Sequence, residues 1–402
     1  MLATPLARRN ALFALFFLPG ITMSSWVTRT PDVRDLVEAS TAQMGLILFG
    51  LSVGSMIGIL AAGPLLARLG ARTLILAGTS SIAVGAVVVG VGAGLGSGVV
   101  VAIGLGMFGL GMGGGEIALN VEGAQVERLL GRSTMPAMHG FFSLGTVVGG
   151  ICGMVLTAIG FPVLAHQVIV GIIVLAVLAL AIRPVPAKGG RRAPADPAGA
   201  ADVPRAPVWR DSRLLLIGAI ILALAMAEGT ANDWLPLVMV DGHGFDPALG
   251  SGVYVVFAAA MTAGRFVGGW FVDRVGRAVV LCASALAGGA GLALVIFVDN
   301  QAVAASAAIL WGLGASLGFP VALSAAADSG EDSAARVTLA AIVGYIAFLV
   351  GPPTLGFLGE AYGLRPALIV VLVLVLAAAL VTPAARARPA PEPEPEPERE
   401  RV

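Results

Sequence analysis

The thirty residues PVPAKGGRRAPADPAGAADVPRAPVWRDSR, Pro184 to Arg213, separate two long hydrophobic parts of the chain. This stretch contains six prolines, six basic side chains and no apolar run long enough to cross a bilayer. Such a composition cannot bury enough apolar surface to offset the entropy lost on ordering, so we expect an exposed linker. The sequence therefore predicts two hydrophobic domains, residues 1–183 and 214–384, joined by a linker at 184–213 and followed by a disordered tail at 385–402.

The composition is that of an integral membrane protein. Of the 402 residues, 57% are hydrophobic and only 12% are charged. Soluble amphipathic helices need a polar face, which so few charged residues cannot supply. The net charge is zero, so no nucleic-acid partner is expected. Cys152 and Cys282 both fall in apolar segments, where a thiol usually acts as a small hydrophobic group, and we expect no disulfide.

Apolar stretches of about twenty residues, each long enough to cross about 30 Å of hydrocarbon, recur along both halves. They predict an all-α integral membrane protein with twelve transmembrane helices in two pseudo-symmetric six-helix bundles. Glycines repeat at four-residue spacing in several spans and predict close helix packing. The predicted spans are residues 10–28, 42–67, 73–93, 98–121, 135–159, 162–182, 214–238, 249–272, 278–298, 302–327, 337–358 and 366–383.

The basic residues predict the orientation in the membrane, because Lys and Arg accumulate in short cytoplasmic loops. With both termini inside, we assign all but Arg29, Arg34 and Arg365 of the 24 Lys and Arg side chains to cytoplasmic ends or loops. We therefore expect the linker and both termini to lie in the cytoplasm. His166 and His243 then fall in external loops.

A short motif occurs once in each half. Gly63-Pro-Leu-Leu-Ala-Arg-Leu-Gly-Ala-Arg72 follows the second span, and Gly269-Trp-Phe-Val-Asp-Arg-Val-Gly-Arg277 follows the eighth. Such internal similarity is typical of duplicated transporter folds. Charges in these loops can pair across the cytoplasmic ends or with helix termini. Alternatively, the arginines only anchor the spans, which leaves the repeated glycines unexplained. The predicted gating residues are Arg68, Arg72, Asp273, Arg274 and Arg277.

These two loops resemble the signature of the major facilitator superfamily, Gly-x-x-x-Asp-Arg-x-Gly-Arg, although the first copy has Ala67 at the position of the Asp. Further stretches resemble a bacterial branch near the fucose permeases. The resemblance implies a monomeric carrier of a small-molecule substrate in the bacterial inner membrane, coupled to protons and working by alternating access. The stretches that carry it are Ser25-Trp26 with Arg29 and Pro31, Glu116 to Asn120, Val126 to Arg132, His139 to Gly145, Glu228 to Trp234 and Gly351 to Gly356.

Few polar side chains occur inside the spans. A charged group at the bilayer centre costs about 2.5 to 3.5 kcal/mol on insertion scales, so each one is a functional candidate. Glu116 and Asn120 lie four residues apart on one helix face, and Glu228 and Asn232 repeat this spacing in the other half. A transport site at the interface between repeats requires groups from both halves.

We expect Glu116 and Glu228 to couple protons, while Asn120, Asn232, Asp233 and His139 line the substrate cavity. The alternative is that the two carboxyl groups are protonated structural groups bonded to neighbouring helices. Asp233 is also consistent with an interfacial residue, beside Trp234 in an aromatic belt.

Other chemistries find no support in the sequence. It contains no Gly-x-x-x-x-Gly-Lys-Ser/Thr stretch and no Cys or His cluster with metal-ligand spacing. We therefore expect no enzymatic activity, no cofactor and no metal.

Three functions remain open. Proton-coupled uptake of a small polar, sugar-like solute follows from the resemblance, although fucose permeases have an acidic residue where this chain has Val27. Proton-coupled efflux of a drug or metabolite is the second, although the Gly-Pro motif of such antiporters is missing between Gly145 and Gly153. A membrane sensor without solute flux is the third.

Overall fold

The computed structural model describes residues 4–131, 134–187, 208–330 and 332–386, and the regular elements among them are helices. Most of the predicted linker and tail, residues 188–207 and 387–402, lies outside the described residues. The helices are α1 (Pro5–Val27), α2 (Thr30–Leu36), α3 (Thr41–Leu69), α4 (Ala71–Gly94), α5 (Gly98–Leu130), α6 (Met135–Ala158), α7 (Val163–Ala181), η1 (Val208–Arg210), α8 (Ser212–Leu237), η2 (Val238–Gly242), α9 (Pro247–Val275), α10 (Arg277–Phe297), α11 (Gln301–Ser316), α12 (Gly318–Ala327), α13 (Ser333–Tyr362), α14 (Leu364–Ala367), α15 (Ile369–Val381) and η3 (Thr382–Ala385).

Twelve helical segments of the described residues are long and apolar enough to cross a membrane, which confirms the predicted spans. Two local features were not predicted. A short helix, α2, fills the loop after the first span, and the tenth span is interrupted at Leu317, where α11 gives way to α12. The chain is a multi-pass membrane protein.

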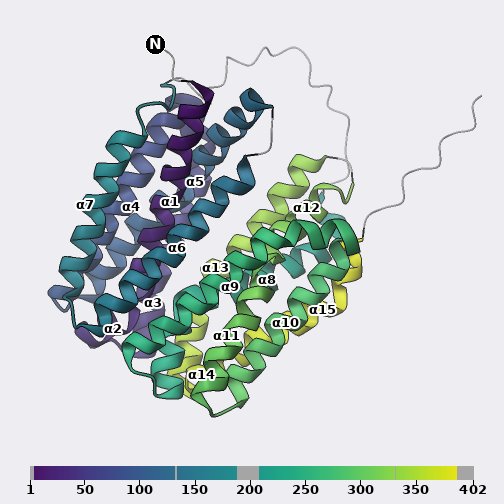
Figure 1. Cartoon of the computed structure of the whole chain (residues 1–402). Helices are drawn as coiled ribbons and strands as arrows, with labels where there is room; N and C mark the ends of the chain where they lie inside the picture. The colour runs from purple at the N-terminus through teal and green to yellow at the C-terminus, as the bar shows by residue number, and fades with distance from the viewer. Residues whose placement is uncertain (1–3, 132–133, 188–207, 331, 387–402) are drawn as a thin grey trace, which may run out of the picture.

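The helices form two bundles, α1 to α7 and α8 to α15 (Figure 1). In the first bundle α5 packs between α3 and α4, and α6 lies along α1. In the second, α9 packs on α11, α8 on α13, and α10 on α15. The bundles contact each other along α3 with α13 and along α6 with α9. Their ribbons diverge at the end where the linker leaves and converge at the opposite end (Figure 1).

Glycine backbones allow the helices to approach closely. A Cβ atom on Gly54 of α3 would lie 2.0 Å from the carbonyl oxygen of Gly106 on α5, and one on Gly149 of α6 would lie 2.3 Å from that of Ile21 on α1. Real side chains do not tolerate such contacts, so these glycines set the helix separation. The predicted role of the repeated glycines in packing is confirmed at these positions.

A buried ion pair ties the linker end of the first bundle together. Arg8 of α1 donates from Nε to Oε1 of Glu122 on α5 over 3.0 Å, and Glu122 is fully buried. Removing one partner of such a pair leaves an uncompensated buried charge, so the pair fixes the start of α1 against α5. The sequence prediction did not include this contact.

Candidate functional site

The centre of the second bundle contains an ion pair. Arg265 of α9 donates from Nη2 to Oε1 of Glu228 on α8 over 2.9 Å, and both residues lie within candidate spans. Their side chains are 29% and 15% exposed, respectively. The sequence prediction placed Arg265 among the cytoplasmic anchors, and this assignment is wrong. Because a charged side chain at this depth is costly, the pair marks a candidate site.

Glu116 of α5 brings a third charged residue from the first bundle into electrostatic range of this pair. The glycines just before it pack against neighbouring helices, Gly113 against α3 and Gly115 against α4. The Glu116 side chain is exposed, and it makes no hydrogen bond or ion pair with another described residue. It does interact electrostatically with Arg265 and Glu228. The Glu116 carboxyl group of the first bundle therefore lies within electrostatic range of the Arg265–Glu228 pair in the second.

The two asparagines of the predicted cavity differ in their contacts. Asn120 buries its Oδ1 atom without a hydrogen-bond partner among the described residues. Asn232 accepts a hydrogen bond from the Tyr254 hydroxyl over 3.2 Å. That hydroxyl also lies 3.5 Å from Oγ of Ser24, on α1 of the other bundle. Asn232 is thus linked through Tyr254 to the contact between the bundles.

The remaining predicted cavity residues differ from each other in their surroundings. His139 of α6 is exposed, and its ring meets Phe16 edge to face at a centroid distance of 5.2 Å. Asp233 and Trp234 are both buried within the protein, so Trp234 does not face the lipid as an aromatic-belt residue would. In addition, η2 continues α8 as far as Gly242, so this span ends later than predicted.

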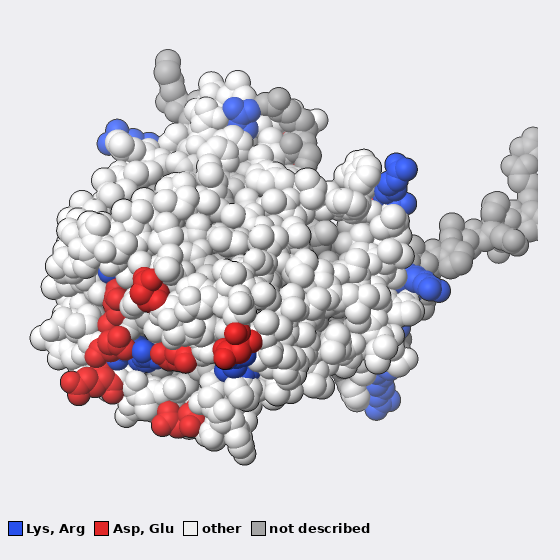
Figure 2. Space-filling view, turned by 60° about the horizontal axis from the view of Figure 1, so that its bottom comes forward, with Lys and Arg blue, Asp and Glu red and all other residues white. Residues whose placement is uncertain are grey.

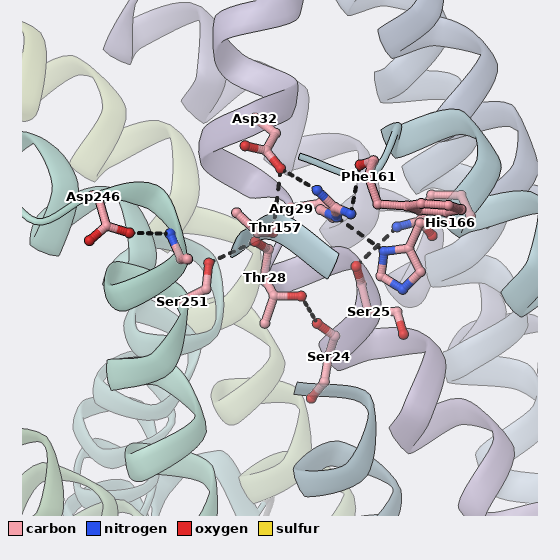
Figure 3. A network of polar contacts seen from close by, with 12 residues as sticks. Ser24, Ser25, Thr28, Arg29, Asp32, Thr157, Phe161, His166, Asp246 and Ser251 are labelled. Atoms are coloured by element: carbon pink, nitrogen blue, oxygen red, sulfur yellow. Dashed lines mark hydrogen bonds and ion pairs between the residues drawn. The ribbon is translucent and has the colours of Figure 1, made fainter. Parts of the chain in front are cut away.

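Beyond the central site, a buried arginine organises the end opposite the linker (Figure 3). Arg29 donates to Asp32 over 2.7 Å, to Nδ1 of His166 over 3.1 Å and to the carbonyl oxygen of Phe161 over 2.9 Å. His166 is buried in α7, so its predicted place in an external loop is wrong. Next to Arg29 in the chain, the Thr28 carbonyl accepts a hydrogen bond from Ser251 of α9 over 2.7 Å. The arginine network therefore supports a contact between the bundles.

Charged groups close the same end at the surface. Arg34 on α2 pairs with Asp241 of the second bundle, and the Glu360 carboxylate of α13 accepts from the backbone N–H of Ala42 on α3 over 3.2 Å. Burial alone would lower the pKa of Arg34, but hydrogen bonds and the charges of Asp35 and Asp241 outweigh it and raise that pKa. Acidic side chains gather at this end (Figure 2).

The predicted gating loops do not meet across the bundles. Arg277 pairs with Asp328 of its own bundle over 2.6 Å, and Arg274 lies over the ring of Trp270. Arg68 and Asp273 are exposed, and neither they nor Arg72 form an ion pair with another described residue. Among the described residues, the expected pairing of charges across the linker end is absent from this conformation, in which the bundles diverge there (Figure 1).

Two bundles of six spans, with an ion pair inside the second and a carboxyl group of the first in its electrostatic range, are typical of a membrane carrier with a duplicated fold. The chain belongs to the Major Facilitator Superfamily, whose family model matches residues 11–344. This membership confirms the resemblance found in the signature loops. Members of this family transport small molecules.

Two relatives align with this chain over most of its length. An uncharacterized MFS-type transporter of Yersinia pestis is 29% identical over 88% of this chain and 89% of its own length. Membrane protein MosC of Rhizobium meliloti is 23% identical over 89% of this chain and 84% of its own.

Solved structures share the fold at low sequence identity. A point mutant of the nucleoside transporter NupG superposes with a TM-score of 0.73 at 14% identity, over 94% of this chain and 99% of its own. A point mutant of the E. coli fucose:proton symporter FucP gives 0.61 at 18% identity, over 94% and 98%. At these identities the likeness establishes the fold alone.

Proposed function

We propose that the protein is a proton-coupled carrier that takes up a small polar solute by alternating access, with Glu116 as the proton-binding group. The observation that carries the proposal is the position of Glu116, which lies in a span, is exposed, and interacts with Arg265 and Glu228 of the other bundle. A carboxyl group held permanently protonated by the fold would have a hydrogen-bond partner at this depth. Glu116 has none among the described residues.

The surroundings of Glu116 make its protonation matter for the contact between the bundles. Arg265 and Glu228 face it, Tyr345 of α13 interacts with it electrostatically, and His139 interacts with the same arginine. A charged Glu116 attracts Arg265 across the interface between the bundles, whereas a protonated Glu116 does not. Binding of a proton therefore changes the free energy of the contact between the bundles at this depth. This change shifts the equilibrium between the inward-open and outward-open states of an alternating-access cycle.

The proposed orientation places the linker and both termini in the cytoplasm of a bacterium, with the chain in the inner membrane. Basic residues predominate at the linker end, and acidic side chains gather at the opposite end (Figure 2). The end closed by Arg34 with Asp241 then faces outward, and the end at which the bundles diverge faces the cytoplasm (Figure 1). Glu228, Asn120, Asn232, Asp233 and His139 are proposed to contact or position the solute.

The test uses purified protein in liposomes, with a solute identified by thermal shift, because a ligand of the native state raises the melting temperature. We expect a pH gradient to drive solute accumulation by the wild type. Glu116→Gln should lose this accumulation but retain binding and counterflow exchange. Arg128→Gln is the matched control, since Arg128 is exposed at the linker end of the same helix.

Two results would contradict the proposal. Accumulation by Glu116→Gln at the wild-type level, with unchanged pH dependence, would remove Glu116 from coupling. Solute movement in the direction opposite to the flow of protons would assign efflux instead of uptake.

A further inference from the structure

Arg265 has more hydrogen-bond donors than its contacts use. A guanidinium group carries five N–H donors, and one hydrogen bond, from Nη2 to Glu228, engages it among the described residues. The side chain is 29% exposed and lies within a candidate span. Free donors of a cation at membrane depth are costly, and a carboxylate matches their planar fork in two parallel hydrogen bonds.

The charges of the site show which solute can use these donors. With both carboxyl groups ionised, Glu116, Glu228 and Arg265 sum to one negative charge. The other titratable groups of the site, His139, Asp233 and Tyr345, keep their protonation states in both the empty and the loaded site. If Glu116 takes a proton and a monocarboxylate binds, the sum is again one negative charge. The loaded and empty sites then have equal charge, so neither state carries an extra penalty for net charge in a medium of low dielectric.

Other classes of solute do not both match the planar donors of Arg265 and keep the net charge of the site unchanged. A neutral sugar that binds together with a proton changes the net charge of the site. It also offers only hydroxyl groups as acceptors for the planar N–H donors of Arg265. An amine places a second cation beside Arg265. A phosphate monoester, which carries nearly two negative charges near neutral pH, needs a second proton to keep the sum unchanged.

We infer that the transported solute is a small hydroxylated monocarboxylate, whose carboxylate binds the free edge of Arg265 when Glu116 becomes protonated. This inference rests on the proposed function and names the substrate class of the same site. Glu228 positions the guanidinium from its other side. The buried Oδ1 of Asn120, which has no partner among the described residues, accepts a hydrogen bond from a hydroxyl group of the solute.

The test compares compounds that share one sugar skeleton and differ in the charge of their substituents. Each set contains a carboxylate with its neutral and amino counterparts, for example galacturonate, galactose and galactosamine, with galactose 6-phosphate as the dianion. Shorter hydroxy acids, each paired with its amide, extend the series. Thermal shift of the full-length protein in detergent gives affinities, and liposome flux under a pH gradient gives transport.

We expect a monocarboxylate to give the largest shift in wild-type protein. Arg265→Lys keeps the charge but loses the planar fork, so it should weaken that affinity about 10- to 100-fold. The paired variant Arg265→Gln with Glu228→Gln leaves neither partner of this pair as an unpaired charge, so it should fold without binding the carboxylate. Wild-type affinity should fall as pH rises and Glu116 ionises, while Glu116→Gln should bind with little pH dependence.

Each contrary result has a defined meaning. Tightest binding by a neutral sugar or an amine, carboxylate affinity unchanged in Arg265→Lys, or no shift with any carboxylate overturns the inference. Proton-driven flux of a neutral solute would support the proposed function and contradict the inference about the substrate class. If carboxylate binding depends on Arg265 but the flux does not depend on the pH gradient, the inferred binding site is supported and proton coupling is contradicted.

Discussion

Arg265 and Glu228 form an ion pair over 2.9 Å between α9 and α8, at a depth where the lipid cannot solvate either charge. Replacing one partner by Gln should destabilise the protein by about 1 to 3 kcal/mol, a range reduced from that of fully buried pairs because both side chains are partly exposed. Replacing both should cost less than the sum of the single changes. Unfolding in a detergent series measures the coupling.

The control is the ion pair of Arg277 with Asp328, whose aspartate is well exposed. Its coupling energy should stay below about 1 kcal/mol, as for other surface pairs. Additive effects at Arg265 and Glu228 would contradict the structural role of the central pair.

Gly54 and Gly63 lie on the same helix, α3, but differ in their surroundings. A Cβ on Gly54 would meet the Gly106 carbonyl oxygen at 2.0 Å, whereas a Cβ on Gly63 meets nothing within 4 Å. Gly54→Ala should destabilise the protein by about 1 to 3 kcal/mol through overpacking. Gly63→Ala should be neutral or stabilising by up to about 1 kcal/mol, since Ala favours the helix. Equal melting temperatures for the two variants would contradict the packing argument.

His243, just outside the seventh span, predicts a pH dependence of stability. Its Nε2 lies 2.9 Å from the carbonyl oxygen of Val295 and therefore donates, while Nδ1 is buried without a partner among the described residues. Burial, and then the charge of Arg365, lower the pKa of His243. The unfolded chain then binds the proton more readily, so this contribution to stability is present above about pH 6.5 and is lost as pH falls below it.

The measurement is the melting temperature of wild type and His243→Gln between neutral and mildly acidic pH. The wild type should lose more stability on acidification than the variant, because Gln can donate to the Val295 carbonyl oxygen without titrating. Identical slopes would show that His243 does not contribute.

Local patterns in the sequence were sufficient to predict the fold. Hydropathy and length locate the spans because each helix must satisfy its own backbone within the bilayer, whatever its neighbours. Glu116 and Glu228 could be predicted for the same reason, as isolated charges in apolar segments. Arg265 gave the same signal within the predicted span 249–272, but counting it as a cytoplasmic anchor concealed it.

The contacts between distant segments could not be predicted. Arg29 and His166 are 137 residues apart, and no spacing rule relates them. The same holds for Arg8 with Glu122, which are 114 residues apart. The depth of Asp233 depended on the continuation of the seventh span through η2, which hydropathy alone did not reveal.

The orientation predicts the labelling of single cysteines. With Cys152 and Cys282 replaced by Ser, a thiol at Gly190 in the linker should be protected from an impermeant reagent added to intact cells. A thiol at Asp299, whose side chain is 89% exposed at the opposite end, should react. Labelling of Gly190 from outside would reverse the proposed topology.

The contacts of Asp241 and Glu360 predict that the closed end opens when their charges are removed. Asp241→Asn weakens the pair with Arg34, and Glu360→Gln weakens the bond to the Ala42 amide at the start of α3. Each exposed contact contributes about 1 kcal/mol or less, so a single change should shift the populations only slightly.

Together, the two substitutions should shift the ratio of closed to open states at this end by about tenfold, because about 1.4 kcal/mol changes an equilibrium that much. Distances between spin labels on the two bundles at this end, measured in liposomes, should show a longer component in the double variant. Asp328→Asn, which removes a charge within one bundle at the linker end, is the control and should leave the distribution unchanged. An unchanged distribution in the double variant would assign closure to Ser251, Tyr254 and the apolar contacts of α3 with α13 instead.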